Sequence, residues 1–148
     1  GMVVREMNRR CNYDSQALRR KLTFLEAAIK AGQHHRTAKD KTTFLSLNKA
    51  MDMDCATASG NDMVRAAELI KFVLEYPPFE MLAVHDEFKC SPVHMNRLRM
   101  HYIEIMAELA DSNIGQDILR QITGTNGTLK KYRTDLADLI RKSNYGIC

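Results

Sequence analysis

The segment that most restricts the fold is an apolar run interrupted by ionisable residues. Residues 79–84 are almost entirely apolar, the ionisable triplet 85–87 follows, and the apolar character resumes at Phe88. Burying an ionised carboxylate without a partner is costly, so such a triplet favours a turn over a strand interior. The pattern predicts that residues 79–84 form a buried strand. We expect residues 80–90 to form an antiparallel hairpin with His85 and Asp86 at or near its turn.

Apolar residues recur at helical spacing along most of the remaining chain. Leu18, Leu22 and Leu25 share one helical face, and Gly32 is expected to end that helix. The expected elements are a short strand at Met2-Val3-Val4, helices at 14–31, roughly 39–51, 59 or 61 to 75, 91–111 and 129–140, and a short helix and turn punctuated by Gly115, Gly124 and Gly127. We therefore expect an α+β, mostly helical fold, with helices packed on a small antiparallel sheet that contains the hairpin.

The composition is that of an ordinary globular protein. With 148 residues, 45% of them hydrophobic and 27% charged, residues 1–148 are expected to form a single domain. No apolar stretch is long enough for a membrane span and no signal peptide is recognisable, which favours a cytoplasmic protein. The four cysteines include no Cys-x-x-Cys pair, and the five histidines show no ligand spacing. This excludes the usual zinc ribbon and predicts reduced thiols.

The charge of the chain is moderately basic. The formal net charge is +4, and basic residues cluster at Arg9-Arg10, at 19–21, at Lys39 and Lys41, and at 130–133. Such clusters suit a polyanionic partner, because each neutralised phosphate releases counterions. Solvated helix faces explain them equally well, and the net charge does not decide between the two.

The hairpin is the candidate site for chemistry. A tight hairpin that projects an aspartate is one way in which nucleic-acid polymerases hold Mg²⁺, and Asp86 has the required place in the sequence. A solvated turn with exposed Asp86 and Glu87 is the simplest alternative. Another is a metal-dependent phosphohydrolase, in which a His-Asp pair lies on a helix and further histidines complete the site. The strand-like residues before the pair disfavour that class, although His94 and His101 follow on a later helix.

The residues around the hairpin resemble a known family. Residues 81–88, MLAVHDEF, resemble motif C of the single-subunit RNA polymerases of phages and mitochondria, where an apolar strand precedes His-Asp. Residues 61–75 and 91–111 are similar to the helices before and after that motif, most closely in virion-type phage polymerases. Residues 1–6 are similar to the family's upstream strand, and residues 138–148 to its aromatic-rich C-terminus. The resemblance identifies the chain with the C-terminal palm segment of this family.

The resemblance carries implications for the chemistry. It implies that Asp86 is one of the two Mg²⁺-binding aspartates of the palm, and that His85 lines the primer-terminus site of a two-metal nucleotidyl transfer. Mg²⁺ would be bound only in the assembled polymerase. Motif A, with the partner aspartate, and motif B, with the nucleotide-binding helix, are absent from this sequence. One carboxylate without that helix cannot position a triphosphate, so the isolated chain is expected to be inactive.

The missing motifs also define the expected partners. We expect a companion polymerase chain carrying motifs A and B, a DNA template and an RNA product, and self-association of the isolated chain, with no membrane partner. The chain would be a subunit of a split enzyme or the product of a truncated frame, in the cytoplasm of the host cell if a phage encodes it. The alternative is a small helical nucleic-acid-binding or protein-interaction module without catalytic activity, in which the His-Asp pair is incidental.

Overall fold

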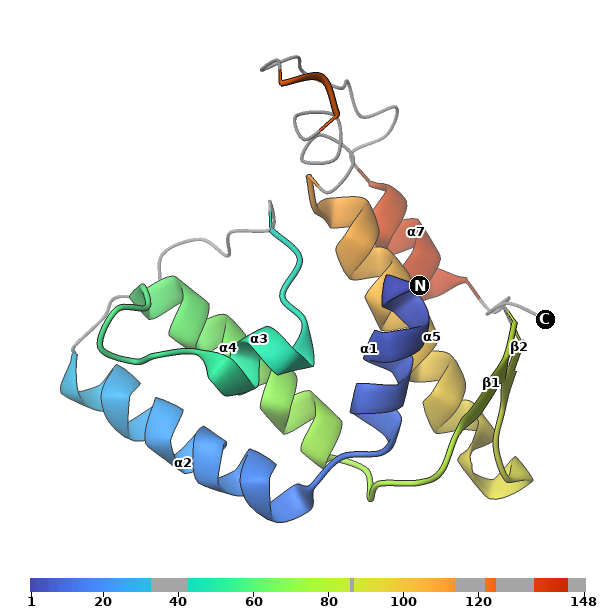
Figure 1. Cartoon of the computed structure of the whole chain (residues 1–148), viewed down its shortest axis with the longest axis horizontal. Helices are drawn as coiled ribbons and strands as arrows, with labels where there is room; N and C mark the ends of the chain where they lie inside the picture. The colour runs from blue at the N-terminus through green and yellow to red at the C-terminus, as the bar shows by residue number, and fades with distance from the viewer. Residues whose placement is uncertain (33–42, 86, 114–121, 125–134, 144–148) are drawn as a thin grey trace.

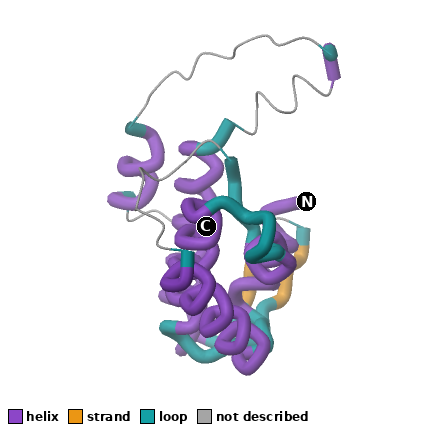
Figure 2. Tube along the Cα trace, turned by 90° about the vertical axis from the view of Figure 1, so that its left-hand side faces the viewer, coloured by secondary structure: helices purple, strands orange, loops and turns teal. Residues whose placement is uncertain are grey.

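The computed structural model describes residues 1–32, 43–85, 87–113, 122–124 and 135–143. These residues are mostly helical and include one two-stranded antiparallel sheet, which confirms the α+β class (Figures 1 and 2). The elements are α1 (Met2–Cys11), α2 (Ser15–Ala31), α3 (Leu47–Asp52), α4 (Gly60–Leu74), β1 (Leu82–Val84), β2 (Glu87–Lys89), the 3₁₀ turn η1 (Pro92–His94), α5 (Met95–Asp111) and α7 (Leu136–Lys142).

Side-chain caps fix the starts of three helices. The Asp14 carboxylate accepts hydrogen bonds from two backbone N–H groups in the first turn of α2, at 3.0 and 3.2 Å. The Ser59 hydroxyl accepts from the backbone N–H of Asp62 at the start of α4, and Ser46 does the same for α3. Each cap satisfies an N–H that the helix itself leaves unpaired. The starts predicted at Asp14 and Ser59 are confirmed.

The apolar side chains form two clusters. In the first, α2 lies beside α4, and α3 packs on α4 (Figure 1). Its buried members are Leu18, Leu25, Leu47, Ala50, Met63, Ala66, Ala67, Leu69, Ile70 and Val73. The second joins α1 to α5 and includes two residues from connecting segments. Its buried members are Met7, Cys11, Phe44, Phe79, Leu98 and Ile105.

A buried ionic network connects the two clusters. The side chains of Glu6 and Arg10, one turn apart on α1, are fully buried, and Arg10 Nε donates to Glu6 Oε1 at 2.9 Å. The same guanidinium donates to both carboxylate oxygens of Glu108 on α5, at 2.8 and 3.3 Å. Glu6 Oε1 also accepts from the backbone N–H of Leu47, at 2.7 Å, at the start of α3. One pair of side chains on α1 therefore contacts both α3 and α5.

The strand predicted at Met2-Val3-Val4 is wrong, because these residues begin helix α1. The buried positions in α1 are Glu6, Met7, Arg10 and Cys11, a helical repeat in which two of the four are charged. A search for helical periodicity detects repeats of apolar residues. It does not detect a buried helix face on which half of the residues are charged. The apolar start of the segment then resembled a short strand.

The helix predicted at 39–51 begins later than expected. Residues 39–42 lie outside the described residues, residues 43–46 are not helical, and α3 starts at Leu47. Phe44 is buried in the second cluster whereas Leu45 packs against the first, so the segment is a connection that places apolar side chains in both. Of the helix predicted at 129–140, residues 136–140 are helical within α7, and residues 129–134 are not described.

The described residues contain no candidate for a membrane-spanning helix. None of their helices combines the length and the apolar character that crossing a bilayer requires.

We predict that Arg10→Ala lowers the free energy of unfolding by about 3–5 kcal/mol, because it leaves the Glu108 carboxylate without its counter-charge and the buried Glu6 with only the more exposed Arg9. Chemical denaturation followed by circular dichroism measures the change. Arg9→Ala is the matched control: Arg9 pairs with the same Glu6 at 3.3 Å, but its side chain is 38% exposed. Its loss should cost less than about 1 kcal/mol. Equal losses for the two variants would show that burial does not set the strength of the network.

Candidate functional site

The hairpin predicted at residues 80–90 is confirmed. The backbone pairs are Leu82 with Lys89, Ala83 with Phe88, and Val84 with Glu87. Only two residues therefore connect the strands, and the first of them, His85, has a φ of 54°. Two-residue hairpin loops need positive φ, because that backbone twist matches the twist of the strands. His85 is exposed in the turn, and Asp86, the predicted metal ligand, lies outside the described residues.

The expected burial of the first strand is wrong. Alternate side chains of the hairpin point to opposite faces, and the described residues cover only one of these faces. On that face Phe88 contacts Tyr102 of α5, with ring centroids 5.7 Å apart. On the other face the side chains of Leu82 and Val84 are 61% and 42% exposed. The apolar side chains of Leu82 and Val84 therefore form an exposed surface and are not part of the core.

The two ends of the hairpin are fixed to each other. Before the hairpin, Phe79 is buried and its backbone N–H donates to the carbonyl of Cys11 at 2.8 Å. After it, the ring of His94 stacks on that of Phe79, with centroids 4.7 Å apart, and Nδ1 of His94 is 2.7 Å from the Tyr76 hydroxyl. Sequence reasoning assigned His94 no role other than that of a potential phosphohydrolase ligand. The structure gives it the role of holding the segments that enter and leave the hairpin.

Arg97 connects the helices before and after the hairpin. Its side chain is 6% exposed and lies over the ring of Phe72 on α4, 4.4 Å from the ring centroid. Its guanidinium donates to the backbone carbonyl of Phe72 and pairs with Glu75 at 3.6 Å. A carbonyl in the last turn of a helix has no partner within that helix, so a cation is favourable there. The end of α4 and the start of α5 are thereby held together beneath the hairpin.

His101 is a buried neutral histidine in the same region. It is 1% exposed, it meets Phe72 edge-on with centroids 5.6 Å apart, and its Nδ1 has no hydrogen-bond partner among the described residues. Burial, with the nearby guanidinium groups of Arg97 and Arg10, lowers the pKa of His101 to about 3. Sequence reasoning noted this residue only as a potential phosphohydrolase ligand.

The structure gives no support to the phosphohydrolase interpretation. Its His-Asp pair requires a helix, whereas His85 lies in a hairpin turn, and His94 is used in packing. Within the described ranges, no three histidine, cysteine or carboxylate side chains are grouped so that they could hold a metal ion. Glu87, the described carboxylate nearest the turn in sequence, is paired with Lys89 at 3.3 Å.

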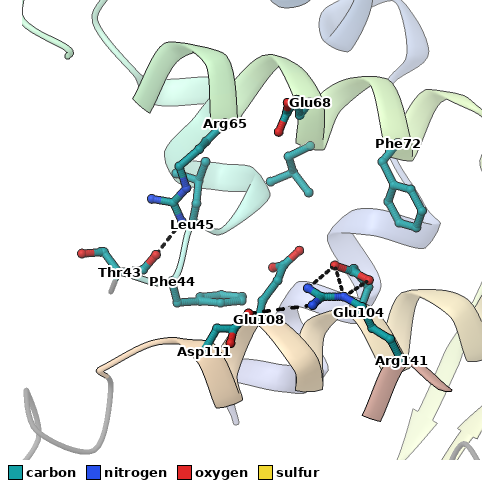
Figure 3. Close-up of a pocket in the computed structure, with 11 residues that line it drawn as sticks. Thr43, Phe44, Leu45, Arg65, Glu68, Phe72, Glu104, Glu108, Asp111 and Arg141 are labelled. Atoms are coloured by element: carbon teal, nitrogen blue, oxygen red, sulfur yellow. Dashed lines mark hydrogen bonds and ion pairs between the residues drawn. The ribbon is translucent and has the colours of Figure 1, made fainter. Parts of the chain in front are cut away.

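A separate groove of about 450 Å³ lies between α4 and α5 (Figure 3). Its lining residues are Thr43, Phe44, Leu45, Arg65, Glu68, Leu69, Phe72, Glu104, Glu108, Asp111 and Arg141. Arg141 of α7 pairs with Glu104 at 2.9 Å and with Asp111 at 3.8 Å, while Glu108 is held by Arg10. These three carboxylates are charge-compensated, and the pairs made by Arg141 attach α7 to α5.

Comparisons with known proteins add no relative. No model of a known protein family matches the chain. No curated protein matches it either. The features that bear on function are the hairpin, the surfaces beside it and the resemblance found in the sequence.

We predict that the buried His101 makes the fold acid-sensitive. The unfolded residue has a pKa near 6.5, so the unfolded state takes up a proton below that pH while the folded state stays neutral down to about pH 3. The free energy of unfolding is therefore unaffected by His101 protonation above about pH 6.5. It falls below that pH, and at pH 5.5 the decrease is about 1.4 kcal/mol.

The measurement is urea denaturation at pH 7.5 and pH 5.5 of the unaltered chain and of His101→Phe. Between pH 7.5 and pH 5.5, the free energy of unfolding should decrease by about 1.4 kcal/mol less for the variant than for the unaltered chain. An identical loss in both proteins would contradict the assignment of a neutral buried imidazole.

Proposed function

We propose that the chain is the C-terminal palm segment of a phage-type, DNA-directed RNA polymerase and works with a companion chain. The observation that carries this proposal is the hairpin, in which a two-residue loop beginning with His85 joins two short antiparallel strands. The resemblance to motif C requires such a hairpin. In this proposal Asp86 is a metal ligand, and His85 lines the site of the primer terminus.

The residues near the turn fit only part of a two-metal site. Asp86 supplies one carboxylate and Glu87 is paired with Lys89, so a second metal-binding carboxylate has to come from the companion chain. Mg²⁺, when bound in the assembled site, would activate the attacking 3′-hydroxyl and neutralise the triphosphate. The role of this chain is to hold the Asp86 carboxylate at a fixed position. The contacts of Phe79, His94 and Arg97 give the hairpin a rigid base for that role.

The two edges of the sheet differ, and the difference favours a companion chain at the edge formed by β1. β2 carries Glu87 and Lys89, and charged side chains on an edge strand oppose pairing with another strand. β1, with the sequence Leu-Ala-Val, carries neither charge nor proline. It also has no second strand partner among the described residues. In the proposed assembly the companion chain covers β1 and its exposed apolar side chains.

We predict that Asp86→Ala abolishes template-dependent primer extension by this chain mixed with a companion carrying motifs A and B, since it removes a metal ligand and no apolar side chain. Gel filtration should show that the complex still assembles. Glu80→Ala is the matched control, because Glu80 is an exposed carboxylate that lies before β1. It should leave extension unchanged. Full activity of Asp86→Ala would exclude Asp86 as a catalytic ligand.

We predict weak Mg²⁺ binding by the isolated chain. A single carboxylate leaves most of the octahedral shell as water, which Mg²⁺ releases reluctantly. Titration calorimetry should give a dissociation constant in the millimolar range or above, and the companion chain should lower it. Tight stoichiometric binding by the isolated chain would require a complete site on this chain and would overturn the need for a companion ligand.

A further inference from the structure

Helix α2 presents an aromatic side chain to solvent. Phe24 is 63% exposed and is absent from both apolar clusters, although Leu25 beside it is fully buried. The residues three and four positions after it are Ala27 and Ala28, which are too small to cover the ring. Arg20 lies one turn before it. The result is an exposed aromatic ring that shares its helix face with Arg20.

The same helix carries an uncompensated positive charge. Its basic residues are Arg19, Arg20, Lys21 and Lys30, and its one acidic residue is Glu26. Glu26 pairs with Lys71 of α4 at 3.0 Å, and Lys21 donates to a backbone carbonyl, that of Met53, at 2.5 Å. Within the described part of the chain, no carboxylate pairs with Arg19 or Arg20, and both are exposed.

We infer that the face of α2 formed by Arg20 and Phe24 binds single-stranded nucleic acid. A base stacks on the Phe24 ring, and a backbone phosphate contacts the Arg20 guanidinium. Exposed aromatic rings combined with basic side chains bind single strands without sequence preference, because every base has a π-face. Arg20 is one helical turn, about 5.4 Å, from Phe24, so one nucleotide can contact both.

The chemistry of the face favours a single strand over a membrane surface. Binding in the interface of a bilayer needs a broad apolar stripe. The other exposed residues around Phe24 are Gln16, Thr23 and Ala27, which supply no such stripe. A duplex offers no unstacked base to the ring.

This site is independent of the proposed polymerase chemistry. In Figure 1, α2 lies on the left of the molecule and the hairpin on the right. A strand held on α2 is therefore held away from strands β1 and β2. The inference stands whether or not the hairpin has a catalytic role.

The test is fluorescence anisotropy of a labelled oligothymidine titrated with the full chain at low salt. Phe24→Ala should weaken binding about 10-fold, because stacking on the ring is lost. Phe24→Tyr should bind as the unaltered chain does. Arg20→Ala should weaken binding and reduce its salt dependence by about one released counterion. Lys49→Ala removes an exposed positive charge on α3. It should change the affinity for oligothymidine by less than about twofold, and Phe24→Ala should weaken binding by the same factor with or without it.

Each alternative outcome overturns the inference. Oligothymidine binding by Phe24→Ala equal to that of the unaltered chain would exclude stacking. Binding of a duplex as tight as that of the single strand would show simple charge attraction. Phe24-dependent binding to phosphatidylserine vesicles, without oligothymidine binding, would assign the face to a membrane. Thermal denaturation of each variant checks its folding, and an exposed Phe24 should leave the melting temperature unchanged.

Discussion

The fold depends on one buried guanidinium. Arg10 lies between Glu6, on its own helix, and Glu108, on a helix 98 residues further along the chain, and it satisfies both carboxylates. Glu6 in turn binds the start of α3 through the backbone N–H of Leu47. These bonds connect the two apolar clusters. Together with the contacts of Arg97 and His101 on Phe72, the network holds α3 and α4 against α1 and α5.

A second arginine determines where the hairpin projects. Arg97 holds the last turn of α4 against the first turns of α5, and the stacked pair Phe79 and His94 closes the base of the hairpin. The two strands contain three residues each, which is too little pairing for independent stability. Their position is therefore set by the helices on either side. In a polymerase palm this arrangement would fix the carboxylate that follows His85.

The sequence predicted the elements whose signals are local. The ionisable triplet 85–87 between apolar runs indicated the hairpin. Asp14 and Ser59 indicated helix starts through bonds to the first turns of their own helices. It missed α1, because the burial of Glu6 and Arg10 requires a partner 98 residues away that no local pattern reveals. The burial of Arg97 was not predicted for the same reason, because its partner is a backbone carbonyl of another helix. The exposure of Leu82 and Val84 depends on which elements cover the sheet. The order of apolar and polar residues along the strand does not specify those elements.

The unequal edges of the hairpin limit how copies of the chain can assemble. If two copies met through β1, each would use the only edge of the described sheet that lacks charged residues. The contact would be isologous, with the same strand on both sides of a two-fold axis. The outer edges of the resulting four-stranded sheet would be the two β2 strands, each with Glu87 and Lys89. A third copy would meet those charges, so the sheet would close at two copies instead of growing into a fibre.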